Sequence, residues 1–279
     1  MGKRILSTLI LWSIVSAIVV FVGRDGAALL VALVSVAAQW ELYVMLERIG
    51  LKPFRHLGVA LGLLLMLGPY FAREWLGPDG KEGLESGIIA VLIVAVSLRV
   101  MRERTGAARM ETLISTVFGI IYIPYMMFFF MRILWLGATE TSGMMMAVWL
   151  VFAAKFCDVG ALVWGSLFGR HKLAPSMSPK KTWEGAVGGV LSSALMCAGL
   201  VALYPHHYPT GFHWWVSALA AIPPAILSIT SDLIESVIKR AADMKDSGRT
   251  IPGIGGAFDL IDSLILAVPV GYLILRLLV

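Results

Sequence analysis

Residues 231–263 have the sequence SDLIESVIKRAADMKDSGRTIPGIGGAFDLIDS and form the most polar stretch of a very apolar chain. They lie between two segments that are each long enough to cross a membrane. In the first half, Asp232, Glu235, Ser236 and Lys239 are spaced i, i+3, i+4 and i+7, so a helix places them on one face. The glycine- and proline-containing middle, residues 247–253, cannot continue that helix and predicts a loop.

A second helix is predicted to open at Gly255–Gly256, and in it Asp259, Asp262 and Ser263 again share a face. Two helices would thus present carboxylates to each other across a glycine-rich turn at the membrane surface. Asp232, Asp259 and Asp262 fall at the inner ends of apolar spans, where a lone carboxylate is costly without a cation. Hard oxygen ligands with no Cys or His nearby favour Mg²⁺, and Mg²⁺ at such a site usually accompanies a phosphate-bearing substrate.

The composition excludes a soluble globular protein. Of the 279 residues, 58% are hydrophobic and 15% are charged, which is too apolar for a chain surrounded by water. The two cysteines, Cys157 and Cys197, lie inside apolar runs, so neither a disulfide framework nor a thiolate metal site is expected. Apolar runs with polar punctuation predict an all-α, polytopic transmembrane helical bundle of about nine spans. The predicted spans are 5–22, 27–46, 57–72, 86–101, 112–131, 143–167, 185–204, 213–231 and 257–277.

The basic residues predict the orientation of this bundle. With a cytoplasmic N-terminus, most of the 23 lysines and arginines fall at inner ends and loops, and the outer side holds Arg24, Arg73, Lys81, Arg132 and Arg276. The positive-inside rule therefore predicts that the N-terminus is inside and the C-terminus outside. We expect two regions: N-terminal transmembrane helices over 1–140 (spans 1–5) and a C-terminal transmembrane catalytic region over 141–279 (spans 6–9 with their cytoplasmic polar loops).

Lys155 and Asp158 lie within the sixth span and allow two interpretations. Ionisable groups at membrane depth often mark a functional cavity. Their i, i+3 spacing equally allows a structural ion pair.

A basic connection precedes the seventh span. Residues 168–184, FGRHKLAPSMSPKKTWE, include Lys180 and Lys181. These lysines are either positive-inside determinants that contact lipid headgroups or point charges in a clamp for a polyphosphate. Lys239 and Arg240, on a turn next to the predicted carboxylates, would also complement an anionic ligand.

Ordered motifs over about residues 150–270 resemble those of the phosphatidate cytidylyltransferase (CDP-diacylglycerol synthase) family. The main motif is Ser236-x-x-Lys239-Arg240-x4-Lys245-Asp246, followed by Ile251-Pro252-Gly253-x-Gly255-Gly256-x-x-Asp259-x-x-Asp262-Ser263. Upstream, the matching segments are Asp158-Val-Gly-Ala161, Phe168-Gly-Arg-His-Lys-Leu-Ala-Pro175 and Ser178-Pro-Lys-Lys-Thr-Trp-Glu-Gly185. The chain departs from the family at two positions, with Ile254 in place of the usual His and Leu260 in place of the usual Arg.

The resemblance implies transfer of a cytidylyl group from CTP to phosphatidate, which gives CDP-diacylglycerol and pyrophosphate for phospholipid biosynthesis. It implies Mg²⁺ as the cofactor, and some family sites are described with a second cation. The expected partners are CTP, phosphatidate and membrane lipids, with a homodimer and without nucleic acid. The short loops are typical of a bacterial inner-membrane protein, and the orientation places the active site on the cytoplasmic side.

The resemblance also implies roles for individual residues. Asp232 and Asp259 would be the leading metal ligands, with Asp262 and Asp246 as supporting carboxylates. The catalytic set would be Asp232, Asp259, Lys239 and Arg240, and the substrate-binding set would be Asp158, Lys180, Lys181, Ser236, Lys245, Asp246, Gly255 and Gly256. In these sets Ser236, Lys239, Arg240 and Lys245 hold phosphate oxygens, Lys180 and Lys181 contact the nucleotide or lipid phosphate, and Asp158 lines the polar cavity.

Other functions stay open at the level of sequence. One is a related lipid-phosphate nucleotidyltransferase or phosphotransferase. Another is a catalytically silent homologue that binds lipid or CTP, which Ile254 and Leu260 keep open. A third is an ion-coupled transporter that uses Lys155 and Asp158, although the charges gather at one cytoplasmic end rather than at mid-membrane in two related halves.

Overall fold

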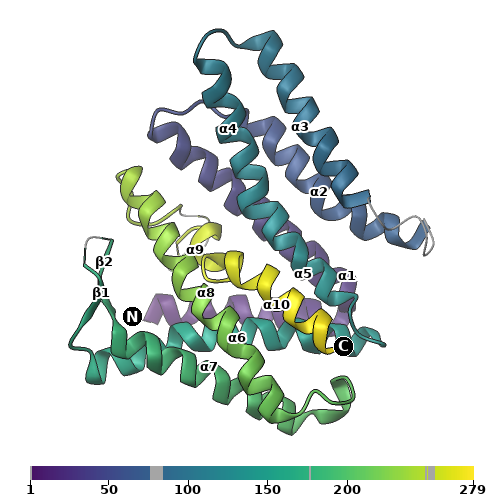
Figure 1. Cartoon of the computed structure of the whole chain (residues 1–279), viewed down its shortest axis with the longest axis vertical. Helices are drawn as coiled ribbons and strands as arrows, with labels where there is room; N and C mark the ends of the chain where they lie inside the picture. The colour runs from purple at the N-terminus through teal and green to yellow at the C-terminus, as the bar shows by residue number, and fades with distance from the viewer. Residues whose placement is uncertain (1, 76–83, 176, 249, 251–254) are drawn as a thin grey trace. The chain divides into compact units, whose positions relative to one another are not determined.

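The computed structural model describes residues 2–75, 84–175, 177–248, 250 and 255–279, and the side chains of residues 2–12, 14–16, 19, 20 and 73–75 lie outside this description. The regular secondary structure of the described residues is helical apart from one hairpin (Figure 1). Its helices are α1 (Gly2–Arg48), α2 (Arg55–Trp75), α3 (Leu84–Glu103), α4 (Ala108–Ile120), α5 (Met126–Leu134), α6 (Glu140–Phe168), α7 (Trp183–Leu203), α8 (Trp214–Ala241), α9 (Ala257–Ile261) and α10 (Leu264–Leu278). A π-helical turn (Ile121–Tyr125) joins α4 to α5, and a 3-10 turn (Pro205–His207) follows α7.

Eight segments of the described residues are long and apolar enough to cross a membrane. They are Phe21–Arg48, Arg55–Ala72, Leu84–Glu103, Ala108–Leu134, Glu140–Phe168, Trp183–Leu203, Trp214–Ala241 and Ala257–Leu278. Each matches one predicted span from 27–46 onward. Large apolar side chains on these helices point outward, as with Leu162 and Leu195, which are each 73% exposed. Because such faces require lipid around them, the chain is an integral membrane protein, and the predicted all-α bundle is confirmed.

The label α1 covers two helical segments that meet at a kink. Gly23, with φ 71° and ψ −146°, is non-helical at this point, so the predicted break at residues 23–26 between two helices is confirmed. A positive φ of this size is readily adopted by glycine and costly for other residues. The remaining predicted span, 5–22, falls mostly on side chains outside the described part of the chain.

The contacts divide the chain into two compact units. Unit 1 comprises Met1–Phe128 and Ala241–Ile261, and unit 2 comprises Phe129–Arg240 and Asp262–Val279. The polar segment after α8 therefore groups with the N-terminal helices, although sequence reasoning placed it in a C-terminal region beginning at residue 141. The assignment of catalysis to residues 141–279 stays a prediction.

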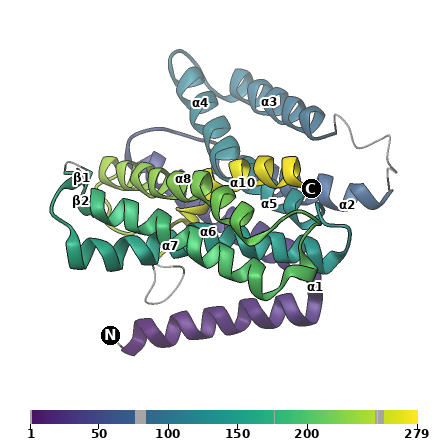
Figure 2. The same ribbon diagram turned by 60° about the horizontal axis from the view of Figure 1, so that its bottom comes forward.

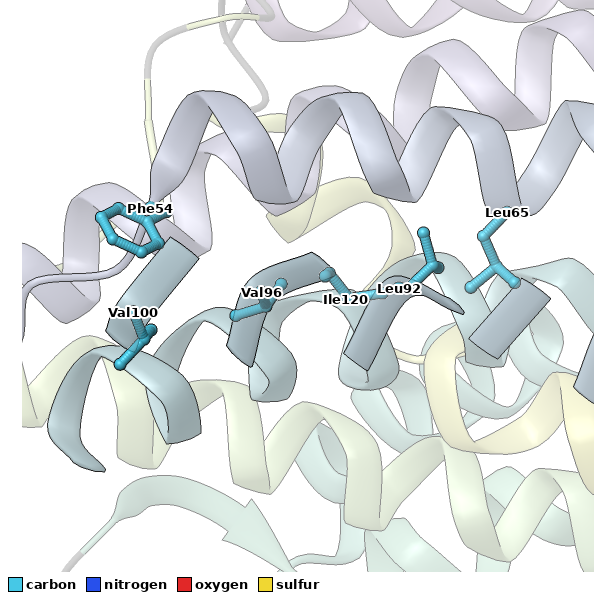
Figure 3. Close-up of a cluster of buried hydrophobic side chains, with 6 residues drawn as sticks. All are labelled: Phe54, Leu65, Leu92, Val96, Val100 and Ile120. Carbon is cyan, nitrogen blue, oxygen red and sulfur yellow. The ribbon is translucent and has the colours of Figure 1, made fainter. Parts of the chain in front are cut away.

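In unit 1, a row of buried apolar side chains joins α2, α3 and α4. Leu92, Val96 and Val100 recur every four residues along one face of α3 and meet Phe54, Leu65 and Ile120 (Figure 3). Lipid is as apolar as these side chains, so close packing rather than exclusion of water holds such helices together.

Interhelical hydrogen bonds add to this packing in unit 1. The Tyr43 hydroxyl donates to the Thr116 carbonyl oxygen at 2.7 Å, and the Gln39 amide donates to the Gly58 carbonyl oxygen at 2.9 Å. A Cβ atom at Gly58 would lie 2.1 Å from the Tyr43 hydroxyl oxygen, and one at Gly119 would lie 2.3 Å from the ring. These glycines therefore allow α2 and α4 to approach Tyr43 on α1.

In unit 2, α6 and α7 lie side by side (Figure 1 and Figure 2). A Cβ atom added to Gly189 on α7 would lie 2.6 Å from the Cys157 carbonyl oxygen of α6, and one added to Gly160 would lie 2.6 Å from the Ser192 side chain. Small residues at such positions are what allows membrane helices to pack backbone against backbone. The Ser193 hydroxyl donates to the Ala153 carbonyl oxygen at 2.7 Å across the same interface.

The basic connection between α6 and α7 is a hairpin of two antiparallel strands, β1 (Lys172–Ala174) and β2 (Ser178–Thr182). Thr182 ends β2 and caps α7 by accepting a hydrogen bond from the Gly185 amide at 3.2 Å. Glu184 accepts hydrogen bonds from the backbone amides of Arg170 and His171, and one of its oxygens lies 2.6 Å from the His171 ring nitrogen Nδ1. The hairpin is thus attached to the start of α7 at both of its ends.

Candidate active site

Three carboxylates meet in unit 2, on α8 and just after α9. Asp232, Glu235 and Asp262 each offer one oxygen, and these oxygens all lie within 4.8 Å of one another. The helix predicted from the i, i+3, i+4, i+7 spacing is α8, so the shared face of Asp232 and Glu235 is confirmed. Glu235 is 1% exposed, and sequence reasoning placed it on this face without assigning it as a ligand.

Lysines lie beside two of these carboxylates. Lys181, at the end of β2, places Nζ 2.7 Å from Asp232 Oδ2. Lys239, one turn after Glu235 on α8, places Nζ 2.5 Å from Glu235 Oε2. The lysine of the hairpin therefore lies against α8, and its role as part of a clamp for a polyphosphate stays a prediction.

A third lysine links α6 to the residues that follow α9. Lys155 Nζ lies 3.7 Å from Asp158 Oδ2 and 3.6 Å from Asp262 Oδ1, and it donates to the Ser263 hydroxyl at 2.7 Å. The predicted pair of Lys155 and Asp158 is therefore formed, and Asp262 extends it. The structural interpretation of the pair is thus confirmed, and its place in a functional cavity stays a prediction.

We call this group the lysine–carboxylate cluster. It comprises Asp158, Asp232, Glu235, Asp262, Lys155, Lys181 and Lys239. With every group ionised, four carboxylates face three ammonium groups, so the cluster has a net charge of about −1. Closely spaced carboxylate oxygens are the ligands that Mg²⁺ prefers, and a net negative charge favours a cation. The residues present therefore fit a divalent cation.

Asp259 belongs to unit 1. Its Oδ2 accepts hydrogen bonds from the backbone amides of Ser247 at 3.0 Å and Gly256 at 2.7 Å, and the Ser247 hydroxyl lies 3.0 Å from the same atom. The structure thus brings Asp232 and Asp262 of the predicted metal set together with Glu235. That Asp259 joins them as a ligand stays a prediction.

Sequence reasoning missed Glu41 on α1. This side chain is 6% exposed and accepts hydrogen bonds from Ser247, Thr250, Ala257 and Phe258. An ionisable residue in the apolar span 27–46 was the available signal, since charges at membrane depth need a partner and often have a function.

The other predicted residues lie at the ends of these elements. Ser236 is half-buried on α8, Arg240 is exposed at its end, and Lys180 is exposed on β2. Lys245 and Asp246 are exposed in unit 1. Gly255 has φ +134°, and a Cβ atom added to it would lie 2.4 Å from Asp259 Oδ2. Leu260 lies in α9 and is half-buried, whereas Ile254 lies outside the described residues.

The fold and the cluster define a class of protein: a helical membrane protein whose spans hold a group of carboxylates and lysines that fits a divalent cation. The chain belongs to the cytidylyltransferase family, whose sequence model matches residues 2–278. The match extends well beyond the motifs at 150–270 and includes the N-terminal helices.

Relatives from three bacteria support this membership. The phosphatidate cytidylyltransferase of Mycobacterium bovis is 28% identical over 274 residues, which cover 94% of this chain and 84% of the relative. That of Staphylococcus epidermidis is 30% identical over 210 residues, 75% of each chain. That of Rickettsia bellii is 32% identical over 230 residues, 78% of this chain and 90% of the relative.

Proposed function

We propose that this protein is a phosphatidate cytidylyltransferase, which transfers the cytidylyl group of CTP to phosphatidate. A phosphate oxygen of phosphatidate attacks the α-phosphorus of CTP, a new P–O–P bond forms, and the bond to pyrophosphate breaks. The products are CDP-diacylglycerol and pyrophosphate. The observation that supports this most is the lysine–carboxylate cluster of unit 2, in a chain whose family match covers nearly every residue.

The chemistry of the reaction fits the residues present. A phosphate monoester dianion is already a nucleophile, so a base to generate one is not needed. The reaction instead requires that two anions approach in line and that charge on the departing pyrophosphate is neutralised. A divalent cation, when bound, supplies part of that neutralisation.

The proposal assigns metal binding and phosphate binding to different residues of this chain. In the proposal, Asp232 and Asp262 of the cluster hold Mg²⁺ together with Glu235, and Asp259 is proposed as a ligand on the sequence motif alone. Lys239 and Arg240, at the end of α8, bind phosphate oxygens of the substrates.

The remaining assignments concern substrate contacts. Lys180 and Lys181 on the hairpin contact the triphosphate or the lipid phosphate, and Ser236, Lys245 and Asp246 complete the polar surroundings. Asp158 holds Lys155 against Asp262 and so sets the charge of the cluster. Titration with Mg²⁺ measures how many cations bind, and so tests whether a second cation is present, as in some family sites.

The test is pyrophosphate release by the purified full-length protein in detergent micelles with CTP, phosphatidate and Mg²⁺. We expect release that needs all three and a lipid product that carries CMP. Asp232→Ala should abolish it, and Glu47→Gln should not, since Glu47 pairs with Arg55 at the surface of unit 1.

Other outcomes would redirect the proposal. CTP binding without pyrophosphate release would overturn the transferase and identify a silent homologue, consistent with Ile254 and Leu260. Release of CDP with another lipid would indicate a phosphotransferase. Substrate flux into liposomes without turnover would indicate a transporter.

We further propose that the protein lies in a bacterial inner membrane with its N-terminus and active site on the cytoplasmic side. Two single-cysteine variants test this orientation. Met177, on the hairpin before α7, and His206, after α7, are both exposed and lie beyond opposite ends of that helix. In intact cells, an impermeant thiol reagent should label His206→Cys and spare Met177→Cys. The opposite labelling would reverse the orientation. The homodimer is tested by the mass of the detergent-solubilised protein.

A further inference from the structure

Glu41 is a buried carboxylate inside a membrane-spanning helix. It lies on α1 within the segment Phe21–Arg48 and is 6% exposed. A carboxylate in such a place is costly unless hydrogen bonds or a counter-charge compensate its lost hydration. The partners of Glu41 therefore indicate what the residue is for.

The partners of Glu41 are four neutral donors from one later segment of the chain. Oε1 accepts from the Ala257 amide at 3.0 Å and from the Thr250 hydroxyl, and Oε2 accepts from the Phe258 amide at 3.0 Å and from the Ser247 hydroxyl at 2.7 Å. An ionised carboxylate offers about four acceptor sites. All four sites are thus filled by donors from two described stretches, residues 247–248 with 250 and residues 255–258, which we together call the turn.

The turn is shaped around this carboxylate. A Cβ atom at Gly248 would lie 2.4 Å from Glu41 Oε1, and one at Gly256 would lie 2.1 Å from Oε2. Glycine at both positions is what allows the backbone to close on Glu41. The amides of Ala257 and Phe258 are the first of α9 and have no acceptor within that helix, so Glu41 supplies the acceptor that they need.

The same backbone also holds Asp259. The Ser247 hydroxyl lies 2.7 Å from Glu41 Oε2 and 3.0 Å from Asp259 Oδ2, and it accepts a hydrogen bond from the Asp259 amide at 3.3 Å. The Ser247 and Gly256 amides, on either side of the turn, both donate to Asp259 Oδ2. Any shift of the two sides of the turn therefore moves the Asp259 carboxylate.

We propose that Glu41 is a positioning residue for Asp259, which it fixes through Ser247 and the start of α9. It touches no substrate in this proposal. The proposal rests on the function given above only for the statement that Asp259 acts in cytidylyl transfer. The positioning itself is a property of the protein that can be measured without turnover.

The decisive variant is Glu41→Gln, which preserves shape but replaces one acceptor oxygen with an NH₂ group. That NH₂ would face either the Ala257 or the Phe258 amide, donor against donor. We expect hydrogen exchange at Ser247, Ala257 and Phe258 to rise by about tenfold or more, while helices of unit 2 keep their protection. We also expect kcat to fall by about 10²-fold, as misplacement of a reacting group by about 1 Å can cause.

The matched control is Gln39→Leu, two residues earlier on α1. Gln39 is also buried, but it forms hydrogen bonds with Tyr43 and Gly58 instead of with the turn. It should lower the melting temperature and leave both the exchange near Ser247 and kcat within about twofold. Glu41→Asp, which keeps the charge on a shorter stem, should recover part of the protection that Glu41→Gln loses.

Ser247→Ala tests the route to Asp259. If Glu41 acts partly through Ser247, the double variant Glu41→Gln/Ser247→Ala should lose less activity than the product of the two single losses. Unchanged exchange in Glu41→Gln, or an equal rise in Gln39→Leu, would overturn the proposal. If Glu41→Gln alters hydrogen exchange but the wild type releases no pyrophosphate, the positioning role of Glu41 stands and the transferase function is rejected.

Discussion

The carboxylates of unit 1 and those of unit 2 are stabilised by different kinds of partner. In unit 1, Glu41 and Asp259 accept hydrogen bonds from backbone amides and hydroxyls. In unit 2, Asp232 and Asp262 lie within 4 Å of lysine ammonium groups. Amides of a folded turn are fixed in place, whereas a lysine on its flexible stem can move when another ion arrives. The comparison suggests that unit 1 fixes geometry and that unit 2 can exchange partners.

The largest expected effect concerns the most buried member of the lysine–carboxylate cluster. Glu235→Gln removes a charge from the set that fits a divalent cation and breaks the ion pair between Glu235 and Lys239. We expect pyrophosphate release to fall on the order of 10²–10³-fold, the range for loss of one electrostatic group in an active site. Mn²⁺ binding, followed by electron paramagnetic resonance, should weaken in parallel. Unchanged Mn²⁺ affinity would remove Glu235 from the set.

Lys155→Ala tests whether unit 2 depends on its built-in counter-charge. Asp158 and Asp262 would face each other without the ammonium group between them, and we expect a loss of about 3 kcal/mol in the free energy of unfolding, at the low end for a buried pair because the groups are partly exposed. Mg²⁺ should raise the melting temperature of this variant more than that of the wild type. Lys155→Ala/Asp158→Asn should recover part of the loss, and equal instability of the two variants would contradict the ion-pair account.

Gly256→Ala tests the fixed turn of unit 1. Its Cβ atom would lie 2.1 Å from both Glu41 Oε2 and Ser247 Oγ, so we expect a loss of about 1–3 kcal/mol, as for overpacked sites. Gly199→Ala on α7 is the matched control, because its Cβ atom meets nothing within 4 Å and alanine favours a helix. Thermal unfolding of the two variants side by side measures the difference. Equal melting temperatures would mean that the turn yields to the added methyl group.

The smallest effect is expected where neither kind of stabilisation operates. Arg99 and Glu103 form an i, i+4 pair at 3.0 Å on α3, and both side chains are more than 40% exposed. Glu103→Gln should change the free energy of unfolding by less than about 0.5 kcal/mol, as is typical of surface pairs. It is also the chemical control for Glu235→Gln. A loss of activity in Glu103→Gln would show that a change of net charge alone explains part of the larger effect.

The sequence was sufficient where a feature depends on neighbours along the chain. Apolar runs predicted each of the spans from 27–46 onward, and i, i+3, i+4 spacing placed Asp232 and Glu235 on one face of α8. The pair of Lys155 and Asp158 was likewise visible from its spacing. These are local consequences of helical geometry.

Other features depend on contacts between distant segments, which spacing does not encode. Glu41 is joined to Ser247 from 206 residues away, and Asp262 reaches Lys155 across more than a hundred positions. The hairpin before α7 was not predicted, because a strand of three residues has too short a pattern to recognise. The break between two helices at Gly23, by contrast, is local and was predicted, since one residue with a positive φ is enough to redirect the chain.

The long sequence separation between Glu41 and its hydrogen-bond donors has a consequence for the synthesis of the protein. At about 5–20 residues per second, a ribosome needs about 10–40 s to make the chain between Glu41 and Ser247. During that time the first helices enter the membrane with a carboxylate whose four donors do not yet exist. The C-terminal part of the chain, which is made last, therefore supplies the hydrogen bonds that α1 requires. A nascent chain cut short before Ser247 loses its C-terminal helices and also leaves α1 with an uncompensated charge.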